Sequence, residues 1–534
     1  MKQLLLSISL LFVGVFSTNA QHDFEYKVVL NPVTVNNMPG LHSYAFAQHN
    51  GKWLLIGGRT DGLHSRQPFS SFPSSNNNSS IYVVDVNKNQ VWSSSLSSLS
   101  TNIQEQLQST NMNFHQIADT LYVIGGYAYS NSQNDHITFP FLTTITVSTL
   151  IDDIVNGASI VSNFKQIEDT TFAVCGGQLN QINNTLYLVG GQKFTGRYNP
   201  MGHATYVQKY TNQIRSFTVN NAGTQLSFDN YKVTTDPVHL RRRDYNLMPV
   251  IQTDRTEGLM ISAGVFQSTV DLPFLYPVQI NAKGYTPIPS FNQYLSHYHS
   301  AHASLFDSTN NKMHMLFFGG MSQYYYQDST LIKDDQVPFV KTISRLSRSS
   351  SGALKEFQLE TKMPELIGAS AEFIVNQQTN HTTSDLIKLP SNSVDTLSIG
   401  HIVGGIYSAT LNPFAANQTS TTKAHTTVYE VILVKDETVS AQPIDGSNPY
   451  HVTFYPNPIE DHIDLQFEAL ANTSVAYYVS NTVGQILTSG EFTPEIIGST
   501  THRIQLDPSI SAQALNVTLV FDSKYFVTKT VVKH

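Results

Sequence analysis

Leu121-Tyr122-Val123-Ile124-Gly125-Gly126 is the clearest copy of a stretch that this chain repeats, a short apolar run that ends in two glycines. The other copies, of which the last is weaker and keeps one glycine, are Trp53–Gly58, Leu186–Gly191, Met315–Gly320, His401–Gly405 and Leu259–Gly264. An unbroken apolar run of this length predicts a strand buried on both faces. A glycine pair lets the backbone turn sharply and pack close to a neighbouring strand. Because such self-similarity is typical of repeat architectures, the stretch predicts an all-β fold of repeated sheets.

The first repeat shows the pattern of one whole unit. Four strands are expected, and they cover Leu41–Phe46, Trp53–Gly58, Ile81–Val86 and Val91-Trp92. With His42-Ser43, the glycine pair, Tyr82–Asp85 and Trp92, this unit resembles the kelch repeat, a four-stranded propeller blade. The resemblance implies a six-bladed kelch-type β-propeller over residues 21–439, although the later repeats mostly keep only the glycine pair. The repeats are longer than the ~50 residues of a typical kelch unit, so the surplus is expected in loops.

The two ends of the propeller region are expected to pair. Residues 23–30 read as a strand that stands alone before the first repeat, and the last repeat lacks a fourth strand after Thr427–Val434. A propeller that does not close leaves an unpaired edge. Pairing of Glu25–Leu30 with Thr427–Val434 would close the ring.

Composition and the N-terminus narrow the class of protein. The chain has 534 residues, a net charge of -8 and 1 Cys, which argues against a nucleic-acid partner and excludes an intrachain disulfide framework. Met1–Gln3 is a short basic start, Leu4–Phe16 is apolar and Thr18-Asn19-Ala20 is a small-residue cleavage site. Residues 1–20 therefore read as a secretory signal peptide, and no transmembrane segment is expected elsewhere.

The last part of the chain has no repeats. It begins with Tyr455-Pro456-Asn457-Pro458, carries Val483-Gly484-Gln485 after Asn481, and ends with Lys533-His534. This segment resembles the type A C-terminal sorting domain of the type IX secretion system of Bacteroidota, although the usual glycine before the last tyrosine is absent. The resemblance implies a small β-sandwich domain at 450–534 after a linker at 440–449, with the secretion machinery as a partner and a secreted or cell-surface location. An ordinary β-sandwich module is the alternative.

Two groups of residues raise the question of a metal or cofactor. Cys175 would suit a copper oxidase of the galactose oxidase type, but Phe172–Gly177 reads as an apolar strand, where a free cysteine behaves as a small hydrophobe. His297 and His299 would share one strand face, and with His302 they could suggest zinc. His42 and His115 hold comparable positions in their repeats, so we expect packing roles, no metal site and no cofactor.

The long loops that follow the glycine pairs suggest where a ligand binds. Loops of this length are uncommon unless they are functional or disordered, and the clearest cover 59–80, 192–213 and 321–340. Their aromatic rings could stack on sugars or anchor a protein, and arginines could fix polar groups. An arginine triplet, Arg241–Arg243, is expected near the channel mouth, where it could bind a ligand or brace the blades. The candidate ligand-binding residues are Arg59, Arg66, Tyr127, Arg197, Tyr198, Arg242, Tyr325 and Tyr407; alternatively, the rings only pack the loops together.

The sequence therefore predicts an exported propeller that binds a glycan or a surface-protein ligand through its long-loop face. The alternative is a carbohydrate-active enzyme, epimerase-like or oxidase-like, on the same fold. No catalytic residue can be assigned from the sequence, and a fold alone does not decide between these functions.

Overall fold

The computed structural model describes residues 24–67, 69–201, 205–392, 394–436 and 441–534. The expected signal peptide, residues 1–20, and the expected start of the mature chain at Gln21 lie outside the described residues. The fold is all-β, as expected: strands form most of the regular structure. Two short α-helices, Thr101–Leu107 (α1) and Val147–Asn156 (α2), lie in connections between strands.

The first four repeats each fold into an antiparallel four-stranded sheet. The first sheet contains β2 (Ala45–His49), β3 (Lys52–Ile56), β4 (Ser80–Asp85) and β5 (Gln90–Ser95). The second contains β6 (Asn113–Ile117), β7 (Thr120–Ile124), β10 (Phe141–Thr146) and β11 (Phe164–Glu168). The third contains β12 (Gln178–Ile182), β13 (Thr185–Val189), β16 (Gln213–Asn220) and β17 (Ser227–Thr235). The fourth contains β18 (Asn246–Ile251), β19 (Glu257–Ser262), β20 (Val278–Asn281) and β21 (Gly284–Pro287).

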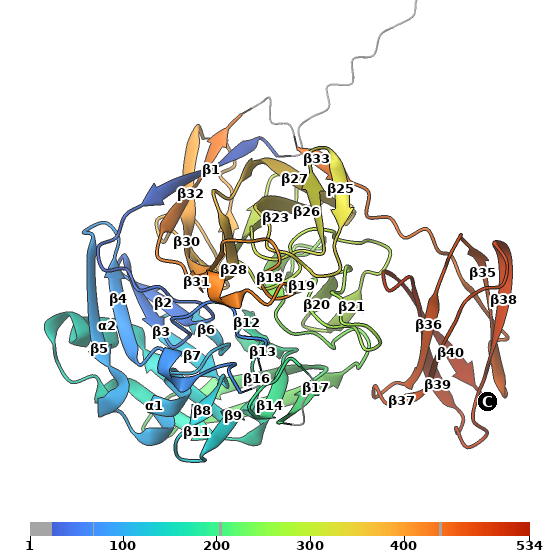
Figure 1. The fold of residues 1–534 in the computed structure, drawn as a ribbon, viewed down its shortest axis with the longest axis horizontal. Coiled ribbons are helices and arrows are strands. Elements are labelled where there is room, and N and C mark those ends of the chain that lie inside the picture. Colours follow the sequence, from blue (N-terminus) through green and yellow to red (C-terminus); the bar gives the residue numbers. More distant parts are fainter. Residues whose placement is uncertain (1–23, 68, 202–204, 393, 437–440) are drawn as a thin grey trace, which may run out of the picture.

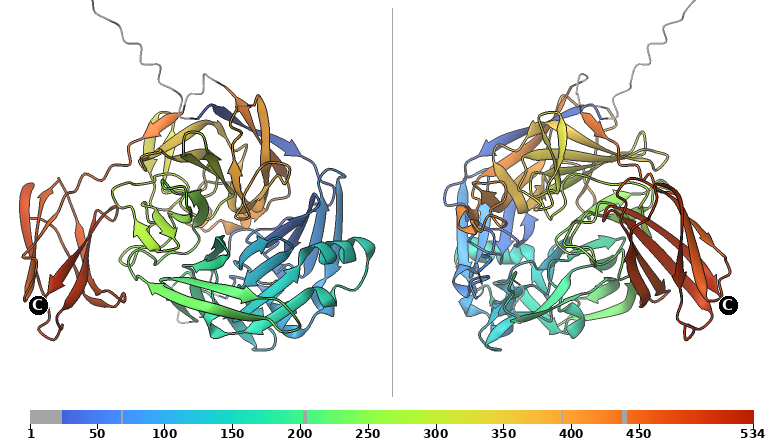
Figure 2. Two further views of the ribbon diagram at one scale, coloured as in Figure 1. Left: turned by 180° about the vertical axis from the view of Figure 1, so that it is seen from behind. Right: turned by 45° about the vertical axis from the view of Figure 1, so that its right-hand side comes forward.

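The last two repeats build larger sheets. The fifth sheet contains β22 (His302–Asp307), β23 (Lys312–Phe318), β26 (Thr342–Arg348) and β27 (Leu354–Lys362), with β29 (Leu386–Lys388) and β33 (Gln442–Ile444) at its edges. The sixth contains β28 (Leu366–Val375), β30 (Thr396–Ser408), β31 (Thr422–Ala424), β32 (Val428–Lys435) and β1 (Tyr26–Val33). These sheets surround a common centre (Figures 1 and 2).

The expected pairing of the two chain ends is confirmed. Strand β1 runs antiparallel to β32, with Tyr26 opposite Lys435 and Val33 opposite Val428. Figure 1 shows β1 lying beside β32. Tyr26 and Val28 are buried in the core between the fifth and sixth sheets. The first strand of the described chain therefore completes the last sheet.

The second glycine of each motif joins its sheet to the next one. Gly126 donates its N–H to the Val174 carbonyl of the third repeat at 3.0 Å, and equivalent bonds run from Gly58, Gly191, Gly264, Gly320 and finally Gly405, which reaches Leu41 of the first repeat. The first glycine provides the close approach: a Cβ on Gly125, whose φ is +66°, would lie 1.8 Å from the Val174 oxygen. The motif is therefore the joint between neighbouring sheets.

A second cycle of backbone hydrogen bonds lies closer to the centre. It contains one residue at the inner end of each sheet: Ser43, Asn111, Gly176, Asp244, His299 and Ser370. Each N–H donates to the carbonyl of the preceding member at 2.8 to 3.1 Å, and Ser43 donates to Ser370. We call these six residues the inner ring. Its closure fixes the positions of the side chains that surround the central axis.

The two ends of the molecule differ in their connections. At one end the turns are short, as between β2 and β3 or between β12 and β13. The exception is the long connection after β28: residues 376–388 cross this end, where Gln377 accepts a hydrogen bond from Gly51 N–H and Thr383 contacts His115 and Gln181. Strand β29 of the same connection pairs with β22 in parallel. Short turns are therefore not uniform at this end, because the sixth sheet has a long connection here.

The long loops at the other end contain strands of their own. Strands β8 (Tyr127–Ser130), β9 (Asp135–Thr138), β14 (Gln192–Gly196) and β15 (Tyr206–Tyr210) form one additional sheet, and β24 (Tyr324–Gln327) pairs with β25 (Thr330–Lys333). The β8–β9 and β14–β15 hairpins come from the second and third repeats, and Thr195 pairs with Ile137 across them. These loops are thus built structures that rest on one another.

Three local expectations were wrong. Phe172–Gly177 is not a strand, because Thr170–Phe172 is a 3-10 turn and Cys175 makes only an isolated bridge to Gln192. His297 and His299 do not lie on a strand, since β22 begins at His302. The expected linker at 440–449 is not a free connection, because β33 pairs with β27.

The C-terminal part forms two further sheets beside the fourth sheet (Figures 1 and 2). One contains β34 (Thr453–Tyr455), β35 (His462–Ala469) and β38 (Gly498–Gln505), and the other β36 (Val475–Asn481), β37 (Ile486–Phe492), β39 (Gln513–Phe521) and β40 (Tyr525–Lys533). They share a core of their own, but Phe526 also packs on Tyr276 with ring centroids 4.6 Å apart. His239 and Gln267 form hydrogen bonds with Thr528 and Ser523. The C-terminal sheets therefore also pack against the fourth repeat.

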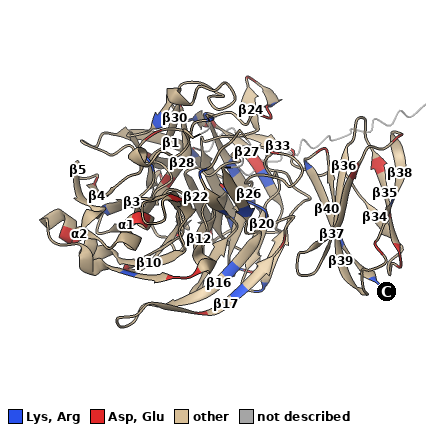
Figure 3. Ribbon diagram, turned by 60° about the horizontal axis from the view of Figure 1, so that its bottom comes forward, with Lys and Arg blue, Asp and Glu red and all other residues tan. Residues whose placement is uncertain are grey.

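Charged residues are scattered over the ribbon with both signs interspersed (Figure 3). Among the described helices, none has the length and apolar character needed to cross a membrane.

Candidate functional site

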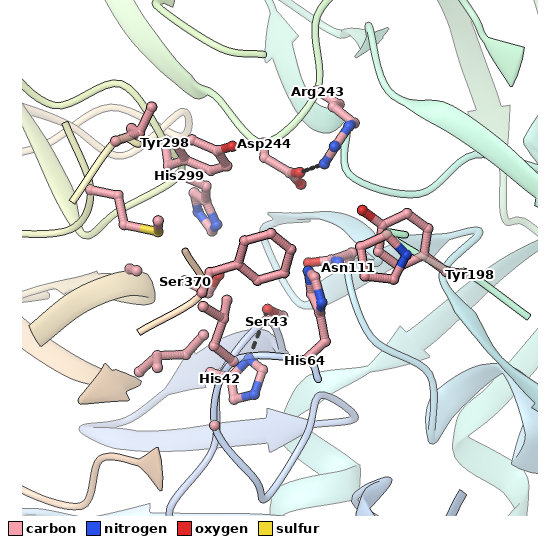
Figure 4. A pocket seen from close by; sticks show the side chains of 18 of the residues that line it. His42, Ser43, His64, Asn111, Tyr198, Arg243, Asp244, Tyr298, His299 and Ser370 are labelled. Atoms are coloured by element: carbon pink, nitrogen blue, oxygen red, sulfur yellow. Dashed lines mark hydrogen bonds and ion pairs between the residues drawn. The ribbon is translucent and has the colours of Figure 1, made fainter. Parts of the chain in front are cut away.

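The inner ring forms the floor of a cavity of about 620 Å³. Five of the six ring residues line it, and its wall comes from the loops that follow the glycine pairs, including residues 59–66, Phe72 and residues 335–337. Figure 4 shows side chains from several repeats pointing toward the same space. The long loops and the ring together thus create one site at the centre of the molecule.

Below the ring lies a much smaller cavity of about 20 Å³. It is lined by ring residues and by Tyr44, Met112 and Glu372. A space of this size holds about one water molecule. The ring therefore separates the large cavity from the end that residues 376–388 cross.

One wall of the large cavity is fixed by a buried ion pair. Arg59, only 2% exposed, donates to both carboxylate oxygens of Asp61 at 2.8 and 2.6 Å, and to Asn77 at 2.9 Å. Burial raises the pKa of Asp61, but hydrogen bonds from His42 and Arg59 hold that pKa well below its usual value. Asp61 therefore stays ionised, and it holds the guanidinium in a fixed position.

The floor carries two further charge pairs. Arg243 forms an ion pair with Asp244, which Figure 4 marks as a dashed line. His299 lies with Nε2 3.4 Å from Glu372 Oε1. Burial lowers the pKa of His299, but Glu372 and Asp244 raise it by more, so that the balance lies above the ordinary value. A histidine held by a carboxylate at a cavity floor can donate or accept a proton.

The remaining wall is aromatic. His64 packs against Phe72, Tyr198 and Phe414, with ring centroids 5.2 to 5.4 Å apart. Burial lowers the pKa of His64 to about 4, so this ring is neutral near pH 7. On another side, Phe266 and Tyr298 line the cavity. Flat apolar rings beside polar groups suit molecules that have both kinds of surface.

Three of the eight candidate residues line the cavity: Arg59, Arg66 and Tyr198. Arg66 donates to the carbonyls of Phe414 and Ala415 at 3.1 and 2.7 Å, so it also holds the rim. All three residues therefore shape the site through contacts within the protein.

The other five candidates lie elsewhere. Arg242 is completely buried and donates to the carbonyls of His239, Ala263 and Tyr276, so it braces the fourth sheet. Tyr127 donates to Gly196 O, and Arg197 donates to Ser71 O.

Tyr325 and Tyr407 lie away from the central cavity as well. Tyr325 lines a separate hollow of about 420 Å³ beside β24. The Tyr407 ring faces the Lys423 ammonium at 5.4 Å. The pattern of aromatic and arginine residues therefore includes three residues that line the cavity, but it did not separate them from residues that support the loops.

The sequence interpretation missed the floor of the cavity. Ser43, Asn111 and Gly176 each precede the second glycine of their repeat by the same number of residues. That spacing was a usable signal in the first three repeats. It is lost at Asp244, His299 and Ser370, because the last three repeats have different lengths.

The residues considered for a metal have other environments. Within the described part of the chain, no cluster of three or more His, Cys, Asp or Glu side chains could hold a metal ion. His297 is buried, with its ring nitrogens bonded to Gln293 O and Gln323 N, and burial lowers its pKa to about 4. Burial raises the pKa of Cys175 to about 12, so this thiol stays protonated near pH 7.

Comparisons with known proteins give matches among solved structures alone. No protein-family model matches this sequence. No curated protein matches it. Among solved structures, one titled "Structure of YjhT" superimposes with a TM-score of 0.43 and 12% identity, over 77% of this chain and 99% of that chain.

Proposed function

We propose that this protein binds a saccharide in its central cavity. The observation that carries the proposal is the cavity of about 620 Å³ that combines aromatic rings, hydroxyl and amide groups and fixed ion pairs. Its volume lies in the range of small-molecule sites. Sugars present an apolar ring face and a rim of hydroxyls, and this lining offers partners to both.

We also propose how the six sheets are arranged. The six sheets are read as the blades of a kelch-type β-propeller over residues 21–439, with β33 added at the edge of the fifth sheet. The two cyclic sets of hydrogen bonds, from the second glycines and within the inner ring, support this reading because each set returns to the first repeat. Pairing of β1 with β32 supplies the closing strand. In a propeller the mouth of the central channel is a common ligand site, which agrees with the position of the cavity.

We also propose that this protein is exported. The N-terminal residues 1–20 carry the signal-peptide pattern, and 450–534 carry the residues that resemble a type IX sorting domain. The C-terminal sheets have their own core, including Ile463, Leu465 and Val517, which supports reading them as a β-sandwich domain. We therefore place the protein at the cell surface or outside the cell, with the secretion machinery as a partner.

A second candidate function, a carbohydrate-active enzyme, rests on one pair of residues. His299 faces the cavity and is held by Glu372, and Asp244 lies at the same floor. These groups could move protons to or from a bound sugar. An NMR time course of each bound saccharide separates the functions: a spectrum that stays unchanged with protein favours binding, and new resonances favour the enzyme.

The experiment compares two neighbouring alanines at the rim. Ala415 lines the cavity, whereas Ala416 is exposed and does not. The mature protein and the variants Ala415→Trp and Ala416→Trp are screened against a glycan array and then titrated with each saccharide that binds. Tryptophan at 415 should weaken binding by about tenfold or more, and tryptophan at 416 should leave it within about twofold. Equal binding by all three proteins, or the absence of any bound saccharide, would contradict the proposal.

A further inference from the structure

The central cavity is open on one side only, and this limits how a chain molecule can enter it. Its floor is the hydrogen-bonded inner ring, and below that ring only about 20 Å³ of space is present. Farther down, residues 376–388 cross the end of the molecule and contact Gly51, His115 and Gln181. In the part of the chain that the structure describes, a long polymer therefore has no path through the centre.

The arginines of the cavity are already neutralised or occupied. Arg59 is bound by both oxygens of Asp61. Arg243 is paired with Asp244, and Arg66 donates to two backbone carbonyls. A ligand carboxylate would have to displace these partners to gain a bidentate contact, which uses two of the five N–H donors of a guanidinium.

The histidines of the cavity do not supply a free positive charge either. His64 is buried, and its pKa of about 4 keeps it neutral near pH 7. Burial also lowers the pKa of His42, despite the nearby Asp61. His299 has Glu372 as its partner. The rim adds two carboxylates, Asp271 and Asp335, of which Asp335 is paired with Lys333 at 3.1 Å. An anionic ligand would thus meet two arginines that are paired with carboxylates, a third, Arg66, that is held by backbone carbonyls, and the negative charge of Asp271.

We infer that the cavity takes the terminal residue of an uncharged glycan, which enters end first from the long-loop side. This rests on the proposed saccharide-binding function and adds two limits to it. A blind cavity selects chain ends over internal segments, and the paired lining selects neutral sugars over sugar acids. Hydroxyl groups can exchange hydrogen bonds with Asn111, Ser370 and the ion pairs without disturbing the charge balance.

The test uses saccharides free in solution and the full mature protein. The neutral probes are glucose, galactose, mannose, xylose, fucose, N-acetylglucosamine and N-acetylgalactosamine, with their linear oligomers of up to about six residues. The acidic probes are glucuronate, galacturonate and N-acetylneuraminate. Dissociation constants are measured by titration calorimetry or by saturation-transfer NMR, with Ala415→Trp as the blocked cavity and Ala416→Trp as its control.

The inference makes two separate predictions for these titrations. At least one neutral series should bind, with an affinity that becomes constant once the cavity is filled by the first one or two residues. The matching uronate should bind about tenfold or more weakly. Affinity that continues to rise through the longest oligomer, or acids that bind as tightly as neutral sugars, would overturn the inference and leave saccharide binding intact. If none of the probes binds, both the inference and the proposed function fail.

Discussion

The same strands are joined by short turns at one end of the central ring and by long loops at the other. At the end crossed by residues 376–388, most turns join adjacent strands over a few residues, and the axis is covered. At the opposite end, the connections after the glycine pairs are long and build the cavity wall. The joint made by the glycines is backbone-to-backbone, so it does not depend on the sequence of the loop after it. One end can therefore be closed for stability while the loops at the other end vary, which agrees with the binding function proposed above.

If this division holds, changes at the closing strand should affect folding most. Tyr26 and Val28 are buried in β1, whereas Lys27 and Asn31 on the same strand are exposed. The double variant Tyr26→Ala/Val28→Ala should lose about 5 kcal/mol of unfolding free energy, because two large side chains leave the core. Chemical denaturation measures the loss, and Lys27→Ala/Asn31→Ala is the control. Equal stability of the two variants would mean that β1 does not close the ring.

The glycine joint should be the next most sensitive feature. A Cβ on Gly125 would overlap the Val174 carbonyl, whereas one on Gly51, which also has a positive φ, has open space around it. Gly125→Ala should therefore cost about 3 kcal/mol or more, and Gly51→Ala about 1 kcal/mol. Thermal and denaturant unfolding of both variants checks the difference. Similar losses at the two sites would show that the joint tolerates separation of the sheets.

Low pH should reduce the free energy of unfolding through His115, which lies at the end crossed by residues 376–388. This side chain is 5% exposed, and burial lowers its pKa to about 4, while an unfolded histidine titrates near 6.5. The unfolded state therefore binds the proton first, and the contribution of His115 to stability falls as the pH drops from 6.5 toward 4. His115→Gln should reduce this loss by about 2 kcal/mol. Stability is followed by denaturation at pH 4.5 and 7.

The contribution of His299, at the floor of the cavity, to the free energy of unfolding should depend on pH in the opposite way to that of His115. The pKa of His299 is raised, so its contribution is fully present below the unfolded pKa and is lost as the pH rises through the folded value. His299→Gln should thus cost more stability at pH 5.5 than at pH 8. If the stabilities of His115→Gln and His299→Gln changed with pH in the same way, the opposite directions given for the two pKa shifts would be refuted.

The smallest effect is expected at Tyr325. Its side chain lines a separate hollow, and it is only partly buried. Tyr325→Ala should change stability by about 0.5 kcal/mol or less and leave saccharide binding in the central cavity unchanged. Titration and thermal unfolding of this variant test both parts. Weaker binding would extend the site to the β24–β25 hairpin.

Much of the fold could be predicted because one local pattern controls it. The apolar run with Gly125-Gly126 determines both the buried strand and the contact with the next sheet, so its repetition was sufficient to predict repeated sheets. The β8–β9 and β14–β15 hairpins were missed, since they are stabilised by each other across two repeats. The pairing of Gln442–Ile444 with β27 was missed for a similar reason, because its partner lies far away in the sequence.

The site was less predictable because the direction of a side chain depends on the assembled ring. Arg242 and Arg243 are neighbours in the sequence, yet Arg242 is buried against backbone carbonyls and Arg243 faces the cavity. Both residues are arginines, so the sequence alone could not distinguish their positions. His299 is a similar case: its role at the floor depends on Glu372, which comes from another repeat.

The most direct test of the central claim is a crystal structure of the mature protein soaked with the saccharide that binds most tightly on the array. The account predicts density for one terminal sugar residue above the inner ring, in contact with Tyr298 and His299. Density beside Tyr325 or on the C-terminal sheets, with only water in the central cavity, would contradict it.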